Sequence, residues 1–169
     1  MGAEGKGGED FVISRVFDVP RERLWEVLTQ AEHLKEWWAP TGFSMIAANL
    51  DLRPEGTFHC GFRAVDGYKM WGKFVYREIV PPERLVFINS FSNAAGGVSR
   101  HPIVPTWPME TLITVTFEEE AGGKSKLNVR WAAHNATEVE QKTFNASHVG
   151  MKATWTGTLD RLAAYVAKG

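Results

Sequence analysis

The 169-residue sequence contains a single cysteine, Cys60, and therefore cannot form a disulfide within the chain. It also lacks an excess of either charge, because 19 basic and 20 acidic residues leave a formal net charge of -1. Electrostatic binding of nucleic acid needs clustered Lys and Arg, and no such cluster occurs. We expect a cytoplasmic protein, in keeping with the unpaired thiol, and no nucleic-acid partner.

Long apolar runs are missing as well. None approaches the roughly 20 residues that cross a bilayer, so no membrane span is expected. Residues 1–10 are rich in glycine and charge and have no apolar segment of the kind found in signal peptides. They are predicted to be a disordered leader, followed by one domain over residues 11–168.

The usual catalytic motifs are absent. The sequence has no nucleophile elbow, P-loop or dinucleotide-binding glycine pattern, and its five histidines show no spacing typical of a metal site. We expect no metal, no cofactor and, on balance, no catalysis. For an enzyme, the candidate general acids or bases are His101, Glu110 and His148.

Aromatic residues, by contrast, are plentiful. The chain has ten Phe, seven Trp and three Tyr, and 44% of its residues are hydrophobic. Large rigid rings either fill a thick core or line a cavity. Composition alone leaves both possibilities open.

Seven segments are rich in β-branched or aromatic residues, and turn residues such as Asp66-Gly67 and Pro81-Pro82 separate them. They predict one antiparallel sheet with strands at 11–17, 43–50, 57–65, 69–80, 84–92, 110–120 and 126–134. Two short helices, 21–28 and 31–37, are predicted between the first two strands.

The C-terminal end has the strongest periodicity. Thr137 and Glu140 have capping-box spacing, and Asn145 is a candidate cap for a second segment. An apolar stripe follows at helical spacing: Phe144, His148, Met151, Trp155, Leu159, Leu162 and Val166. Beside it runs a stripe of small residues, which either lets the sheet approach the helix closely or leaves room for something between them: Gly150, Ala153, Gly157 and Ala164.

This order of elements predicts an α+β helix-grip fold. A curved antiparallel sheet has one concave face that must be covered, and the C-terminal helix is the only element long enough to cover it. Residues 93–108 form a long segment without periodicity, which is predicted to be either a lid or a structural loop. The lid residues would be Arg100, His101, Ile103 and Val104.

The sequence resembles the START-like (SRPBCC) superfamily, and within it the activator of heat-shock-protein-90 ATPase homologue-like family. The segments that carry the resemblance are the opening strand with helix 20–28, then 32–34, 37–40, 51–56, Gly72 with 77–79, 81–86 and, in the terminal helix, Gly150, Trp155 and 159–162. The resemblance implies an apolar cavity between the sheet and the long helix.

The residues expected to line this cavity are mainly aromatic: Trp37, Phe58, Cys60, Phe62, Trp71, Phe74, Phe87, Trp107, Trp131, His148, Met151 and Trp155. The leading hypothesis is a non-enzymatic protein, monomeric or weakly dimeric, that binds a small lipid-like or polyketide-like ligand there. One alternative is a cyclase or hydratase that uses the same cavity. The other is an activator of a chaperone ATPase with a chaperone partner.

Overall fold

The computed structural model describes residues 10–40 and 42–168. The predicted leader therefore lies outside the described residues except for Asp10, whose carboxylate pairs with Arg130 at 2.9 Å. The helices and strands follow the order β1 Phe11–Phe17, α1 Arg21–Thr29, α2 Ala31–Trp37, β2 Phe43–Leu50, β3 Thr57–Ala64, β4 Lys69–Val80, β5 Arg84–Ser92, β6 Val98–Ser99, β7 Glu110–Glu120, η1 Ala121–Gly123, β8 Lys124–His134, α3 Glu138–Ala146 and α4 His148–Ala167.

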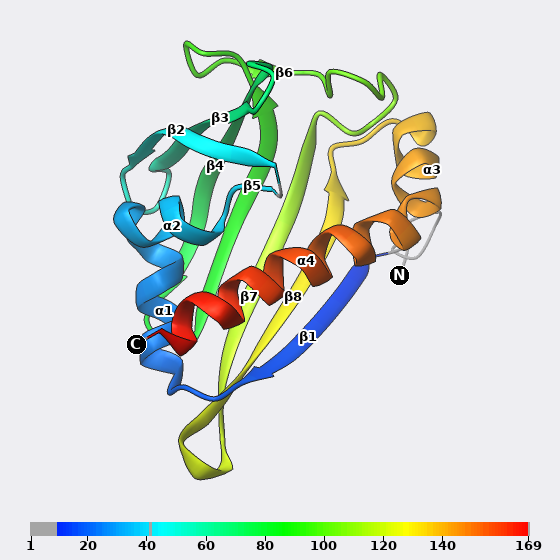
Figure 1. Ribbon diagram of the computed structural model, residues 1–169. Coiled ribbons are helices and arrows are strands. Elements are labelled where there is room, and N and C mark those ends of the chain that lie inside the picture. Colours follow the sequence, from blue (N-terminus) through cyan, green and yellow to red (C-terminus); the bar gives the residue numbers. More distant parts are fainter. Residues whose placement is uncertain (1–9, 41, 169) are drawn as a thin grey trace.

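All strands belong to one antiparallel sheet with the order β1-β8-β7-β5-β4-β3-β2, as Figure 1 shows. The seven predicted strands are present, and β6 adds a short eighth strand beside β5, within the segment expected to have no regular structure. α4 runs diagonally across the sheet. The predicted α+β helix-grip fold is thus confirmed.

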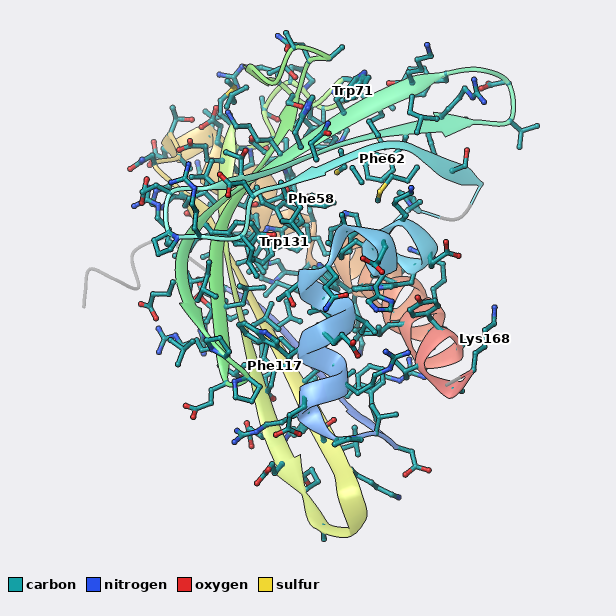
Figure 2. The ribbon with its side chains drawn as sticks, turned by 90° about the vertical axis from the view of Figure 1, so that its left-hand side faces the viewer. Phe58, Phe62, Trp71, Phe117, Trp131 and Lys168 are labelled. Atoms are coloured by element: carbon teal, nitrogen blue, oxygen red, sulfur yellow. The ribbon has the colours of Figure 1, made fainter. Side chains whose placement is uncertain are left out.

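The sheet is strongly curved, and Figure 2 shows α1, α2 and α4 on its concave side. Alternation along the strands decides which side chains face the helices. In β3, Phe58, Cys60 and Phe62 are buried on one face, whereas Arg63 on the other face is exposed. The core consequently forms between the concave face and the helices.

α4 carries most of the predicted apolar stripe. Met151, Trp155, Leu159, Leu162 and Val166 are all buried against the sheet and the first two helices. A helix covers a sheet in this way when its apolar residues recur every three or four positions. The period that was visible in the sequence therefore fixes the face that α4 turns inward.

The region before α4 differs in detail from the prediction. The Thr137–Glu140 capping box is present and begins α3. α3 then ends at Ala146, and Ser147 separates it from α4. Asn145 is not the cap of the second segment, because it lies inside α3 and its side chain accepts a hydrogen bond from Gln141 Nε2 at 2.9 Å.

Over residues 10–40 and 42–168, none of the helices has the combination of length and apolar composition required to cross a membrane.

Candidate functional site

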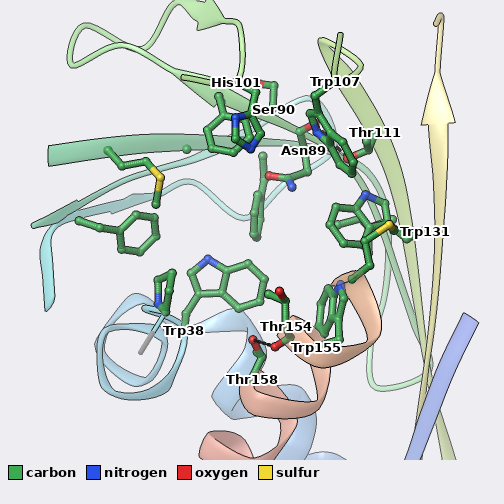
Figure 3. Close-up of a pocket in the computed structure, with 18 of the residues that line it drawn as sticks. Trp38, Asn89, Ser90, His101, Trp107, Thr111, Trp131, Thr154, Trp155 and Thr158 are labelled. Carbon is green, nitrogen blue, oxygen red and sulfur yellow. Dashed lines mark hydrogen bonds between the residues drawn. The ribbon is translucent and has the colours of Figure 1, made fainter. Parts of the chain in front are cut away.

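A cavity of about 470 Å³ lies between the concave face of the sheet and the first half of α4 (Figure 3). Its size falls in the range of small-molecule sites. The sheet contributes residues from five neighbouring strands, β3, β4, β5, β7 and β8. The remaining walls come from α4, from Trp38 and Pro40 after α2, and from the loop between β6 and β7.

Four tryptophans form one continuous aromatic wall of this cavity. Trp38 contacts Trp155, Trp155 contacts Trp131, and Trp131 contacts Trp107. The three centroid distances are each 5.9 Å, and the ring planes meet at 64°, 80° and 69°. These are edge-to-face contacts, which aromatic pairs prefer over stacking in full register. The wall is built from four elements that lie far apart in the sequence.

Eight of the twelve residues expected at the cavity border it in the structure: Cys60, Phe62, Trp71, Phe74, Trp107, Trp131, Met151 and Trp155. Trp71 differs from the rest in its orientation. Its indole stacks on His59 with a centroid distance of 5.1 Å and lies directly over Gly61. A Cβ atom at Gly61 would approach this ring to 2.6 Å, so only glycine leaves space for it.

Phe58 and Phe87 were expected at the cavity but do not border it. Both rings lie against Phe74, with centroid distances of 5.2 Å and 4.2 Å. They are buried on the same face of the sheet as the lining residues, further along their strands, where the core is closed. Alternation therefore predicted correctly which face of the sheet these rings occupy, but not whether they lie at the cavity or in the closed core.

Trp37 and His148 were also expected to line the cavity, and they too lie elsewhere. The indole of Trp37 is buried beside α1 and donates a hydrogen bond to the Val27 carbonyl at 3.0 Å, while its neighbour Trp38 takes the place at the cavity. The His148 ring packs against Phe11 and Phe144 at 5.7 Å and 5.4 Å. It belongs to the contact between α4, α3 and β1.

Several polar residues at the cavity were not predicted. They are Asn89 and Ser90 in β5, Thr111 in β7, and Ser147, Thr154 and Thr158 at α4. Asn89 carried a signal in the sequence, since it continues the alternation of Leu85, Phe87 and Phe91 on the concave face. Because side chains alternate along a strand, a polar residue at the same alternate positions as buried apolar residues faces the interior.

The loop between β6 and β7 covers one end of the cavity. His101 and Val104 border the cavity, whereas Arg100 does not, and Ile103 is 77% exposed. Two of the four predicted lid residues thus face away from the site. The Arg100 guanidinium instead pairs with the buried Glu140 carboxylate at 2.8 Å and so fastens the loop to α3.

His101 holds the turn of this loop. Its Nδ1 accepts the backbone N–H groups of Ile103 and Val104, both at 3.0 Å. Its ring lies 4.6 Å from that of Phe91. Burial lowers the pKa of His101, so the imidazole is neutral near pH 7.

The thiol of Cys60 borders the cavity from β3. Burial raises the pKa of Cys60 to about 12, although a contact with the Gly72 carbonyl partly offsets this effect. A thiol with such a pKa is protonated at neutral pH and is a poor nucleophile. Cys60 therefore contributes a small apolar surface.

The stripe of small residues on α4 meets the cavity at one position. Gly150 borders it, and a Cβ atom there would meet nothing within 4 Å. Gly157 does not border the cavity, because it faces the Arg161 side chain at 3.7 Å. Ala153 and Ala164 are exposed. Only Gly150 keeps space open next to the site.

Of the three candidate general acids or bases, only His101 reaches the cavity; Glu110 and His148 do not border it. In the part of the chain that the structure describes, no group of three or more His, Cys, Asp or Glu side chains is arranged to hold a metal ion.

The comparisons with known proteins agree with this architecture. The model of the family described as "Activator of Hsp90 ATPase homolog 1-like protein" matches residues 18–167. No curated protein matches the chain.

Solved structures of bacterial proteins share the fold. A protein of Rhodobacter sphaeroides has a TM-score of 0.76 at 20% identity, with 97% of this chain and 95% of that chain covered. A protein of Nitrosomonas europaea has a TM-score of 0.72 at 22% identity, with 94% of each chain covered. A protein of Silicibacter pomeroyi has a TM-score of 0.71 at 19% identity, covering 94% and 98%. At such identities the likeness concerns the fold alone.

Proposed function

The chain belongs to the family of Activator of Hsp90 ATPase homolog 1-like proteins, and from this premise we propose that it binds a small hydrophobic or amphipathic ligand between the sheet and α4. The observation that carries the proposal is the cavity of about 470 Å³ with its wall of four tryptophans. Apolar cavities with a few polar groups are the usual form of small-molecule sites.

The character of the lining supports binding rather than catalysis. Among the described residues, none of the lining side chains is a carboxylate, a lysine or an arginine. The thiol of Cys60 is held protonated and His101 is engaged by the backbone of its own loop. The single unpaired cysteine also supports the cytoplasm as the compartment of the protein.

The test is to block the mouth of the cavity at Gly150, an exposed residue that borders it. A Cβ atom there meets nothing within 4 Å, so Gly150→Phe should fold, and its ring at the mouth should hinder binding. The matched control is Ala153→Phe, which puts the same ring on the exposed side of α4. Binding of the neutral dye Nile red is followed by its fluorescence, and folding by circular dichroism.

The proposal expects Nile red to bind the wild-type protein and Ala153→Phe equally, and Gly150→Phe at least tenfold more weakly, since the ring removes the space that the dye needs. Equal binding to all three proteins would place the dye outside the cavity and contradict the proposal. Absence of binding to the wild-type protein would contradict it as well.

Activation of a chaperone ATPase is the property that the family description names. Stimulation of Hsp90 ATPase by this protein, unchanged in Gly150→Phe, would show a function that does not use the cavity. Stimulation is not the expected result, because the feature on which the proposal rests is the lined cavity and not a surface.

A further inference from the structure

Asn89 is the one polar residue among the side chains of β5 that face the concave side of the sheet. Leu85 and Phe87 precede it on this face and are buried, and Phe91 follows it at the cavity. Figure 3 shows the Asn89 side chain extending from the sheet into the space above Trp38 and Thr154. The strand itself therefore turns this amide toward the interior of the cavity.

The Asn89 side-chain amide has no hydrogen-bond partner among residues 10–40 and 42–168. Its main-chain carbonyl is engaged, because it accepts the Thr111 hydroxyl at 3.3 Å. An amide offers two N–H donors and one acceptor oxygen. Asn89 is only partly buried, so its amide remains accessible to a molecule that enters the cavity.

The cavity has nothing with which to balance a charged ligand. Its lining in the described part of the chain contains no Lys, Arg, Asp or Glu, and burial keeps His101 neutral near pH 7. A carboxylate or an ammonium group that entered would lose its water without gaining a counter-ion. The lining therefore selects uncharged molecules.

The aromatic wall adds a constraint on shape. Trp38 and Trp155 lie across the cavity from Asn89, and their rings meet edge to face, at 64° (Figure 3). Aromatic rings in edge-to-face or offset contact are stabilised beyond the effect of the area they bury, so an aromatic ligand gains from this wall what a saturated chain does not. A planar ring system placed between this wall and the sheet would bring its substituent to Asn89.

We propose that the ligand is an uncharged molecule with a flat ring system, and that its single polar group, a carbonyl or a hydroxyl, hydrogen-bonds to the side-chain amide of Asn89. This inference rests on the proposed function and specifies the ligand class. Asn89 is then the residue that sets the orientation of the ligand, whereas the lack of a charged side chain in the described lining disfavours fatty acids and other anions.

The test uses three probes that share one ring system. Naphthalene has no polar group, 2-acetylnaphthalene adds a neutral carbonyl, and 2-naphthoate adds a carboxylate that is ionised at pH 7. Dissociation constants are measured by ligand-observed NMR titration. We expect the ketone to bind about five- to tenfold tighter than naphthalene, as one hydrogen bond allows, and the carboxylate at least tenfold weaker than the ketone.

Variants locate the effect at Asn89. Asn89→Leu keeps the side-chain size and removes all hydrogen-bonding atoms, so the ketone should lose its advantage over naphthalene. Asn89→Asp keeps the shape and removes the N–H donors, and should lose the same advantage. Asn49→Leu is the matched control, because Asn49 is exposed on β2 and lies outside the cavity.

The outcomes separate the two proposals. If naphthalene, the ketone and the carboxylate bind the wild-type protein equally well, the inference about Asn89 is wrong and binding in the cavity stands. If no probe binds, both proposals are wrong. The wild-type series does not depend on any variant, so the inference stays testable even if Asn89→Leu fails to fold.

Discussion

The two ends of the space between the sheet and α4 are built differently. At one end, which we call the filled half, Leu24 and Val27 of α1, Phe117 of β7, and Leu159 and Leu162 of α4 are buried in direct contact. At the other, the cavity half, the same sheet and the same helix enclose about 470 Å³ of free space. Figure 2 shows Phe117 beside α1, well below Trp131.

The two halves differ in the types of residue that they bring together. The filled half packs leucine and valine side chains around Phe117, and protein cores pack at the density of an organic crystal. The cavity half uses tryptophans, which lean on one another edge to face, together with Gly150 on the helix. The tryptophans are positioned by contacts with one another and leave free space beside the first half of α4. The same helix therefore packs in the core along one half and borders the cavity along the other.

Cys60 gives the largest expected effect, because it reports how dry the cavity half is. With its pKa near 12, the thiolate fraction at pH 7 is about a thousandfold below that of an ordinary thiol with a pKa of 9.0. Alkylation of the native protein by iodoacetamide should be slower by about this factor than alkylation of the unfolded protein. The rate is measured by mass spectrometry.

A native rate close to that of the unfolded protein would mean that water fills the cavity half and reaches the sulfur. The difference in packing between the two halves would then be a difference in solvation. The same measurement after saturation with Nile red is a control, since a bound dye should slow the reaction further or leave it unchanged.

The second prediction compares deletions in the two halves. Leu162→Ala, at a fully buried position of the filled half, should lower the free energy of unfolding by about 3–4 kcal/mol, because it removes contacts and leaves a new void. Met151→Ala removes a side chain that already borders free space, and should cost about 2 kcal/mol. Urea denaturation measures both values, and the reverse order would contradict the distinction between the halves.

The third prediction concerns how the loop over the cavity half is held. The N–H hydrogen bond within the capping box and the Arg100 guanidinium lower the pKa of Glu140. A carboxyl group whose folded pKa is depressed stabilises the protein above its unfolded pKa, and this contribution is lost as the pH falls through the folded pKa. Glu140→Gln retains capping-box geometry and removes the charge.

Glu140→Gln should therefore be about 1 kcal/mol less stable than the wild type at pH 7, and the difference should shrink between pH 5 and pH 3. Glu138→Gln, at an exposed position in the same first turn of α3, is the control. A difference that persists at pH 3 would show that the ion pair with Arg100 is not its cause.

The sequence was sufficient to predict the filled half and the fold around it. Alternation in the strands and the apolar stripe on α4 each require one buried face, and that requirement is local. The cavity half was predicted less well, because the position along a strand at which the core ends and the cavity begins depends on distant elements and not on the strand's own sequence. Phe58 and Phe62 have the same phase in β3, yet only Phe62 reaches the cavity.

The choice between Trp37 and Trp38 illustrates the same limit. The two indoles are adjacent in sequence and meet edge to face at 5.6 Å. Trp37 shares the buried face of α2 with Leu34, three residues earlier, and donates its N–H to the Val27 carbonyl. Helical spacing is therefore consistent with the position of Trp37. It does not predict that Trp38, after the helix end, borders the cavity, because the Trp38 ring packs against Phe74 and Trp155 from distant elements.

The smallest expected effect is at Gly150, on the helix side of the cavity half. A Cβ atom there has open space, so the protein does not need glycine for packing. Replacing glycine by alanine in a helix interior gains about 0.5–1 kcal/mol, and Gly150 is the third residue of α4. Gly150→Ala should therefore raise the free energy of unfolding by no more than this amount, measured by urea denaturation. Gly61→Ala should lower it, because Trp71 occupies the space. A destabilised Gly150→Ala would mean that the mouth of the cavity is packed by protein, and the free space that distinguishes the cavity half would not extend to α4.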